Sequence, residues 1–163
     1  MTTKPQDLKI IKESSTADNK SVKDYMTKSP EFVSPGATIK EAAIKMASLN
    51  TGSLPVGDGE KLNGFITDRD IVVRGIAEGI DPESVTVEKI MTDKVLYCYE
   101  DNDLVAVANN MKDNEVLRLV VLDNNKKFKG VITHSQLAEA AVEEDSYELC
   151  KKVTELACYD KIF

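Results

Sequence analysis

The chain has 163 residues, of which 21 are Lys or Arg and 28 are Asp or Glu, so its net charge is −7. That length suits one domain or two small modules, and an acidic chain without a basic block is repelled by nucleic acid and by anionic lipid. The longest uninterrupted apolar runs, Val95–Tyr99 and Leu104–Ala108, have five residues, whereas a membrane-spanning helix needs about 20. We therefore expect neither a nucleic-acid-binding protein nor a membrane protein.

The cysteines and the N-terminal sequence indicate a cytoplasmic protein. Cys98, Cys150 and Cys158 are odd in number and include no CxxC pair, which argues against a disulfide framework or a zinc ribbon. The first residues contain no apolar segment of the kind that a signal peptide needs.

The sequence repeats itself. VKDYMT at Val22–Thr27 matches VEKIMT at Val87–Thr92, 65 residues further along. The same offset pairs Ile39 with Leu104, Ala43 with Ala108, Met46 with Met111, Leu54 with Leu119 and Val56 with Val121. After one extra residue in a turn the offset becomes 66, and Gly64 then pairs with Gly130 and Thr67 with Thr133. We interpret the chain as two copies of one module of about 60 residues, a size near the lower limit for independent stability, so the copies are expected to bury faces against each other.

The elements of the first copy follow from periodicity and turn chemistry. In chain order they are an opening turn Val22–Met26 after the N-cap Ser21, an extended piece Glu31–Val33, a helix from the N-cap Thr38 to about Asn50, strands Ser53–Val56 and Leu62–Thr67, and a helix Asp68–Glu78. Gly79 is expected to end the last helix.

The second copy repeats this order. Its expected elements are an opening turn Val87–Met91, a strand Val95–Tyr99, a helix with the apolar face Leu104, Val107, Ala108 and Met111, strands Leu117–Leu122 and Phe128–Thr133, and a helix from about Ser135. Each copy thus reads β-α-β-β-α, and the predicted fold is α+β (mixed α/β), a tandem pair packed with pseudo-two-fold symmetry.

The expected domain organisation has four parts. They are a flexible tail at 1–20, a first motif at 21–80, a second motif at 81–144 and an amphipathic helix at 145–163. The helix is predicted from the spacing of Leu149, Val153, Leu156 and Ala157.

Three segments carry a family resemblance. SLPVGDGEKLNGFITDRDI, RLVVLDNNKKFKGVITHSQL and ITDRDIVVRGIAEGIDPESVTVEKIMT together resemble a CBS-domain pair, or Bateman module, of the stand-alone bacterial type, over about Val22–Ala141. The resemblance implies a non-catalytic regulatory module. Such modules bind adenine nucleotides (AMP, ADP or ATP), NAD or S-adenosylmethionine in clefts between the two copies, and they dimerise through their helices.

The resemblance places the strongest candidate ligand-binding residues at Thr67 and Asp70. The Asp70 carboxylate has the acceptor capacity to bind a ribose diol, with the Thr67 hydroxyl beside it. The same two residues also fit a capping box, which is a purely structural role. In the second copy, Thr133 is followed by Gln136, which preserves a capping box but not a carboxylate. We therefore expect two unequal sites.

Further ligand-binding candidates come from family position. Arg69, Arg118 and Lys28 could bind phosphate, since an arginine fork donates two hydrogen bonds; alternatively they are ordinary surface charges. Leu54, Pro55, Ile66 and Leu119 could hold adenine with their backbone and edges; alternatively they are plain core strands.

Three functional classes remain in competition. The favoured one is a ligand sensor that acts on a separate protein effector, with no cofactor and no metal. The second is a structural dimerisation or adaptor protein with empty clefts. The apolar residues of helix Asp68–Glu78 cover more than one face of the helix, which suits self-association or burial between the copies. An enzyme is not expected, because the chain contains no P-loop, GxSxG, HExxH or dinucleotide fingerprint, and His134 is expected to be structural or exposed.

Overall fold

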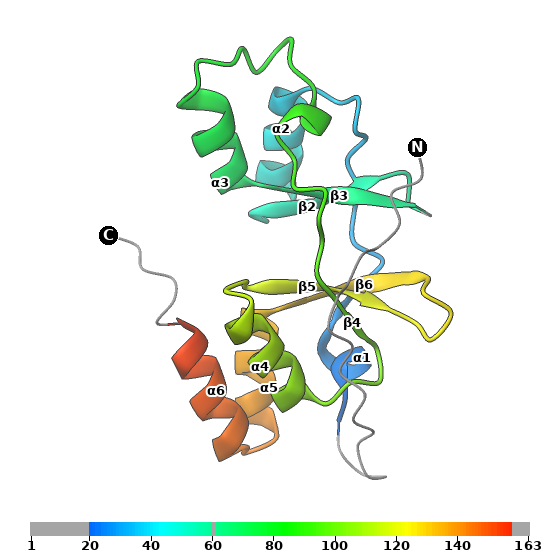
Figure 1. Ribbon diagram of the computed structural model, residues 1–163, viewed down its shortest axis with the longest axis vertical. Helices are drawn as coiled ribbons and strands as arrows, with labels where there is room; N and C mark the ends of the chain where they lie inside the picture. The colour runs from blue at the N-terminus through cyan, green and yellow to red at the C-terminus, as the bar shows by residue number, and fades with distance from the viewer. Residues whose placement is uncertain (1–19, 60, 158–163) are drawn as a thin grey trace. The chain divides into compact units, whose positions relative to one another are not determined.

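The computed structural model describes residues 20–59 and 61–157 and divides the chain into two compact units (Figure 1). One unit comprises Ser29–Val95 and is here called the α2 unit. The other, here called the α6 unit, comprises Met1–Lys28 together with Leu96–Phe163. Within 20–59 and 61–157, no helix is long and apolar enough to cross a membrane.

The α2 unit consists of helix α2 (Ile39–Leu49) packed on a hairpin of β2 (Ser53–Gly57) and β3 (Leu62–Thr67). The helix begins at a capping box, in which the Glu41 backbone N–H donates to Thr38 Oγ1 at 3.2 Å and the Glu41 carboxylate accepts the Thr38 backbone N–H at 2.7 Å. It ends at Asn50, which adopts the left-handed conformation. The core of the unit contains Val33, Ile39, Ala42, Met46, Leu54, Val56, Ile66, Ile71, Val87 and Ile90.

Two predicted elements of the α2 unit differ from the observed ones. The extended piece expected at Glu31–Val33 reduces to a single parallel bridge between Val33 and Val56. The α-helix expected over Asp68–Glu78 is one α-helical turn, α3 (Asp68–Asp70), continued by a π-helix, η1 (Ile71–Ile76). The Ala77 N–H accordingly bonds to the Val72 carbonyl, five residues back. Gly79, with φ of +70°, follows this helix in the expected place.

The α6 unit is built on a four-stranded sheet with the order β1-β6-β5-β4. The strands are β1 (Thr27–Lys28), β4 (Tyr97–Tyr99), β5 (Arg118–Leu122) and β6 (Phe128–Thr133). Only the β4–β5 pair is parallel. The helices of the unit are α1 (Val22–Tyr25), α4 (Leu104–Asp113), α5 (His134–Glu143) and α6 (Tyr147–Ala157), and Figure 1 shows α4, α5 and α6 together on one side of this sheet.

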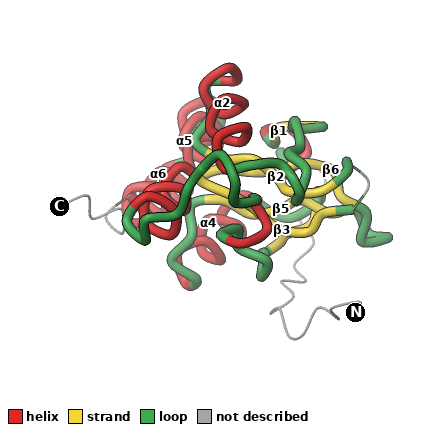
Figure 2. Tube along the Cα trace, turned by 90° about the horizontal axis from the view of Figure 1, so that it is seen from above, coloured by secondary structure: helices red, strands yellow, loops and turns green. Residues whose placement is uncertain are grey.

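Helix α6 is the predicted amphipathic helix, and it packs on α4 and α5 (Figure 2). Its apolar residues Leu149, Val153 and Leu156 are buried in the core of the α6 unit. The Val153 carbonyl accepts a hydrogen bond from His134 Nε2 at 3.0 Å, so the histidine has a structural role at the start of α5. The part of the predicted helix at 158–163, like the predicted tail at 1–19, lies outside the described residues.

The two repeats exchange their opening segments. Thr27 and Lys28, from the first repeat, pair with Val131 and Gly130 of the second repeat in β6. Conversely Thr92, from the second repeat, forms a bridge with Phe65 in β3 of the first, with N–H···O distances of 2.9 and 2.8 Å. The compact units therefore do not coincide with the ranges 21–80 and 81–144, which remain a division of the sequence into repeats.

Each exchange brings a backbone carbonyl against a glycine. A Cβ atom on Gly130 would lie 2.1 Å from the Thr27 carbonyl oxygen, and one on Gly64 would lie 2.4 Å from the Thr92 carbonyl oxygen. The two glycines occupy matched positions in the repeat. Their lack of a side chain is what allows the opening segment of the other repeat to pair there.

Replacing either glycine by alanine should therefore destabilise its unit. We expect Gly64→Ala and Gly130→Ala each to lower the free energy of unfolding by about 1–3 kcal/mol, because the backbone must shift to relieve the clash. Urea unfolding of the purified variants measures this. Gly36→Ala is the control, since the nearest atom to its Cβ would be Ser34 Oγ at 3.8 Å. Equal stability of all three variants would contradict the explanation.

Candidate functional site

The candidate site in the α2 unit is the N-terminal cap of α3. Asp70 Oδ2 accepts the backbone N–H of Thr67 at 2.9 Å and its hydroxyl at 2.7 Å, while the Asp70 N–H donates to Thr67 Oγ1 at 3.1 Å. The predicted capping box is thus confirmed. The other carboxylate oxygen, Oδ1, lies 3.4 Å from Arg74 Nη1. Because the box uses one oxygen only, the cap leaves acceptor capacity on the second.

Arg74 connects this cap to the exchanged segment of the second repeat. Its Nη1 donates to the Ile90 carbonyl at 3.0 Å and to Thr92 Oγ1 at 3.1 Å, in addition to pairing with Asp70. Arg74 is not among the sequence-predicted site residues, because two of its contacts are with residues 16 and 18 positions away. Two signals were available in the sequence: its spacing of four residues from Asp70, which suits an ion pair on a helix, and its matched position in the second repeat, which is Ala140.

In the matching cap of the α6 unit, both ends of the Gln136 amide form hydrogen bonds within the protein. Gln136 Oε1 accepts the backbone N–H of Thr133 at 2.9 Å and its hydroxyl at 3.1 Å. Gln136 Nε2 donates to Thr27 Oγ1 at 2.9 Å, so both ends of the amide are occupied. In the α6 unit the cap residue Gln136 contacts Thr27 directly. In the α2 unit the cap residue Asp70 reaches the matching threonine, Thr92, through Arg74.

The remaining candidates in the α2 unit lie next to its cap. In the hairpin, Leu54 stands opposite Ile66 and Pro55 opposite Phe65. Leu54 and Ile66 are core residues, 1% and 0% exposed with their backbone included. Arg69 is exposed on the first turn of α3.

The candidates in the α6 unit lie on its β-sheet. Arg118 is half-buried and stands opposite Thr133, in the register that Ser53 and Thr67 have in the other hairpin. The sequence match between Arg118 and Ser53 is thereby confirmed. Leu119 is buried beside it, and Lys28 is exposed on β1 opposite Gly130.

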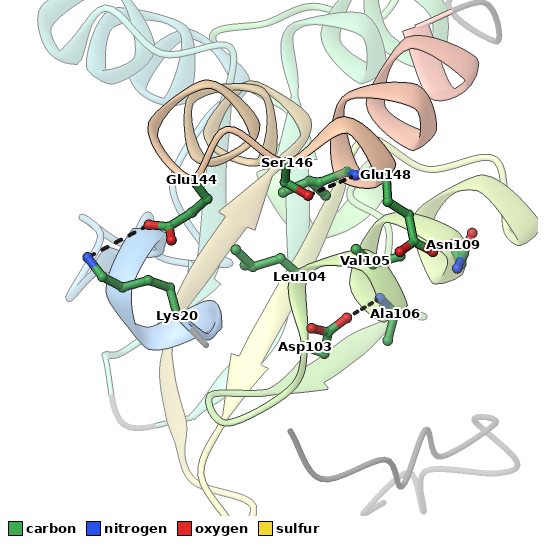
Figure 3. Close-up of a pocket in the computed structure, with 10 residues that line it drawn as sticks. Lys20, Asp103, Leu104, Val105, Ala106, Asn109, Glu144, Ser146 and Glu148 are labelled. Atoms are coloured by element: carbon green, nitrogen blue, oxygen red, sulfur yellow. Dashed lines mark hydrogen bonds and ion pairs between the residues drawn. The ribbon is translucent and has the colours of Figure 1, made fainter. Parts of the chain in front are cut away.

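A pocket of about 570 Å³ in the α6 unit is made of other residues (Figure 3). It lies where α4 begins and where α5 gives way to α6, and it is lined by Lys20, Asp103, Leu104, Val105, Ala106, Asn109, Glu144, Ser146, Glu148 and Leu149. Asp103 caps α4 through the Ala106 N–H at 3.0 Å, and Glu144 accepts the Tyr25 hydroxyl at 2.5 Å. None of the ten predicted ligand-binding residues lines it. In the part of the chain that the structure describes, no cluster of three or more His, Cys, Asp or Glu residues could hold a metal ion.

Comparison with known families identifies the fold. The CBS domain model matches the chain twice, at residues 22–75 and 87–143, so the chain belongs to the CBS domain family. It is 37% identical over 119 residues to the uncharacterised protein YlbB of Bacillus subtilis, covering 72% of this chain and 79% of that protein. It is also 29% identical over 132 residues to hypoxic response protein 1 of Mycobacterium tuberculosis, covering 80% of this chain and 92% of that protein.

One solved structure of a similar CBS domain pair contains adenosyl ligands. The CBS domain pair of protein MJ0100, in complex with 5′-methylthioadenosine and S-adenosyl-L-methionine, is 30% identical to this chain with a TM-score of 0.66. The match covers 74% of this chain and 98% of that one. The predicted family and the predicted α+β fold with two CBS motifs are thus confirmed.

A double-mutant cycle should detect an interaction free energy between Arg74 and Thr92. We expect Arg74→Met to lower the free energy of unfolding by about 1 kcal/mol, because it removes a half-exposed guanidinium and its hydrogen bonds to the Ile90 carbonyl and the Thr92 hydroxyl. Thr92→Val should cost less in that background than in the wild type, as urea unfolding of the double-mutant cycle tests. The control is Lys40→Met, which removes an exposed ion pair with Glu83 and should change stability little. Fully additive effects of Arg74→Met and Thr92→Val would exclude the link.

The two described cysteines should differ in reactivity. Burial on β4 raises the pKa of the Cys98 thiol to about 12, whereas Cys150 is exposed on α6. Since the thiolate is the reactive form, iodoacetamide at pH 8 should label Cys150 at least about tenfold faster than Cys98. Peptide mass spectrometry measures both rates, and guanidinium unfolding should remove the difference. Equal labelling of the folded protein would be inconsistent with a buried Cys98.

Proposed function

We propose that the chain is a non-catalytic regulatory module that binds an adenosine-containing small molecule, with the α3 cap as its ribose-binding element. The candidate ligands are AMP, ADP, ATP, NAD and S-adenosylmethionine. Support comes from membership of the CBS family and from the similarity to the MJ0100 pair, which was solved with two adenosyl compounds.

One observation supports Asp70 as the ribose-binding residue. Asp70 is held in place by the capping box yet has a second carboxylate oxygen whose nearest partner, Arg74, is at 3.4 Å. A carboxylate oxygen in that position accepts hydrogen bonds from a ribose diol. Gln136, its counterpart, has both amide ends engaged at about 3 Å within the protein. This difference favours a stronger site on Asp70 than on Gln136.

The other candidates take the roles that family position implies. In the α2 unit, Leu54, Pro55 and Ile66 would contact adenine through backbone and edges, and Arg69 is the candidate for phosphate. In the α6 unit, Leu119 and Thr133 are the counterparts of Leu54 and Thr67, with Arg118 and Lys28 as the cationic residues. Each is a proposal that substitution can test singly.

Such a module would act by binding its protein effector differently in the presence and in the absence of the ligand. A ligand shifts a protein between states only by its differential affinity for them. We infer that the chain works as a homodimer through its helices, in the cytoplasm, and acts on a separate protein effector.

A structural dimerisation protein with empty clefts is the second candidate. The observation that favours it is the set of exposed apolar side chains on α2 and η1. Such a protein would self-associate but would not respond to adenosyl compounds.

Thermal melting against AMP, ADP, ATP, NAD and S-adenosylmethionine tests the proposal. A ligand present at 100 times its dissociation constant stabilises the folded state by about 2.7 kcal/mol, or about 5–10 °C for a chain of this length. We expect at least one compound to produce such a rise. In Asp70→Asn, whose amide oxygen still caps the helix, we expect the affinity to fall at least about tenfold with little loss of stability.

The matched control is Asp81→Asn. Asp81 is an exposed carboxylate of the same unit, whose pKa is lowered by hydrogen bonds from the Ser84 hydroxyl and the Glu83 N–H. It should leave the adenosyl response unchanged. A flat response of the wild type to the whole panel at millimolar concentrations would sink the sensor proposal, and a full response in Asp70→Asn would remove Asp70 from the site.

A further inference from the structure

The pocket of the α6 unit lies where the described part of the chain begins. Lys20, the first described residue, lines the pocket together with the residues that begin α4. The turn between α5 and α6 forms another wall, to which Glu144 and Ser146 belong (Figure 3). The residues that precede Lys20 in the sequence are therefore connected to the molecule at the edge of this pocket.

The repeat provides an internal comparison for this pocket, because the opening segments enter the two units in the same register. Three successive backbone contacts match, residue by residue, at an offset of 65, and their N···O distances lie between 2.8 and 3.2 Å. In the α2 unit they are Glu88 N–H to the Pro35 carbonyl, Val87 N–H to the Ala37 carbonyl and the bridge between Thr86 and Thr38. In the α6 unit they are Lys23 N–H to the Glu100 carbonyl, Val22 N–H to the Asn102 carbonyl and the bridge between Ser21 and Asp103.

In the α2 unit these contacts continue over the first turn of α2. The Lys40 N–H donates to the Pro82 carbonyl at 2.9 Å, and the Lys40 ammonium pairs with Glu83 at 2.6 Å. Val85 is half-buried and packs against the core of the unit. The residues just before the opening segment thus cover the start of α2, and they satisfy an N–H group for which the helix itself has no acceptor.

The described residues of the α6 unit lack the matching contact. Val105 is the counterpart of Lys40, and its N–H has no hydrogen-bond partner within residues 20–59 and 61–157. The counterpart of Pro82 is Ala17, which lies outside the described residues. The pocket is found at this turn of α4, at the place in the repeat that Pro82–Val85 fill in the α2 unit. Every residue carries a backbone carbonyl, so the contact does not require similar side chains in the two segments.

We propose that the pocket of the α6 unit is the docking site of the chain's own segment Ala17–Asn19, which crosses the first turn of α4 and offers the Ala17 carbonyl to the Val105 N–H. Lys20 fixes the end of this segment, since its ammonium lies 3.9 Å from Glu144 and 5.9 Å from the centre of the Tyr25 ring. Because so few residues separate the docked carbonyl from Lys20, closing the contact costs little chain entropy. The pocket is thereby assigned to a contact within the chain, independently of the proposed function.

Amide hydrogen exchange of the full chain, followed by NMR, tests this contact. In the wild type the Val105 N–H should be protected to the same degree as its counterpart, the Lys40 N–H. Deletion of residues 1–19 should make the Val105 N–H exchange at least about tenfold faster, because the accepting carbonyl is removed. The Ala106 N–H, which donates to Asp103 Oδ1 at 3.0 Å, should keep its protection and so report that α4 is still formed.

The matched control is a deletion of residues 1–14, which retains residues 15–19. It should leave the exchange of the Val105 N–H unchanged. An unprotected Val105 N–H in the wild type, unchanged exchange after deletion of residues 1–19, or equal loss of protection in the two deletions would each overturn the proposal. Loss of protection at Ala106 together with Val105 would also overturn it, because the deletion would then act by fraying the helix.

A nitroxide spin label tests where the segment lies. In the Cys150→Ser/Cys158→Ser background, a label on Asp18→Cys should broaden the amide resonance of Val105. Glu83→Cys is the matched control, since Glu83 is the counterpart of Asp18, and its label should broaden amide resonances in the first turn of α2. A mixture of spin-labelled chain with isotope-labelled chain that carries no nitroxide reports contacts between copies and should show no broadening. Broadening in that mixture, or its absence at Val105 in the spin-labelled chain itself, would contradict docking within one chain.

Discussion

Each unit is closed by a threonine carbonyl that passes within contact distance of a glycine. Thr27 approaches Gly130 in β6, and Thr92 approaches Gly64 in β3. Thr27 belongs to the first repeat, which supplies the smaller part of the α6 unit. Thr92 belongs to the second repeat, which supplies the smaller part of the α2 unit. A side chain at either glycine would keep the opening segment away from the sheet. The exchange of opening segments, and with it the composition of both units, depends on these two contacts.

The same exchange reaches the caps where the candidate ligand-binding residues lie. Thr27 is fixed by Gln136, and Thr92 is fixed by Arg74, which also pairs with Asp70. Under the proposed function, a ribose that binds Asp70 Oδ1 competes with Arg74 for that oxygen. Arg74 in turn holds Ile90 and Thr92, which belong to the opening segment of the second repeat. The contacts thus give a ligand at the cap a direct physical link to the exchanged segment.

The sequence predicted what depends on local spacing. The repeat, both hairpins, the caps at Thr38, Thr67 and Thr133, and the helix that became α6 all follow from patterns within a few residues. The exchange was not predictable, because VKDYMT and VEKIMT are similar enough for either copy to fit either sheet. The π-helical turns of η1 were also missed, since Ile71, Val72 and Ile76 suit an α-helix equally well. Arg74 was missed because two of its partners, Ile90 and Thr92, are distant in sequence, although its pair with Asp70, four residues before it, follows from local spacing.

The two repeats have diverged in a consistent direction. In the second repeat, Gln136 uses both ends of its amide within the α6 unit, and α6 covers the helix pair. In the first repeat, Asp70 keeps a carboxylate oxygen with only a long contact, to Arg74. The proposed ribose-binding cap consequently falls in the α2 unit. Because η1 continues directly from the α3 cap, one short helix carries both Asp70 and Arg74. Under the proposed function, a ligand that displaces Arg74 therefore acts on the residue that holds Ile90 and Thr92 of the exchanged segment.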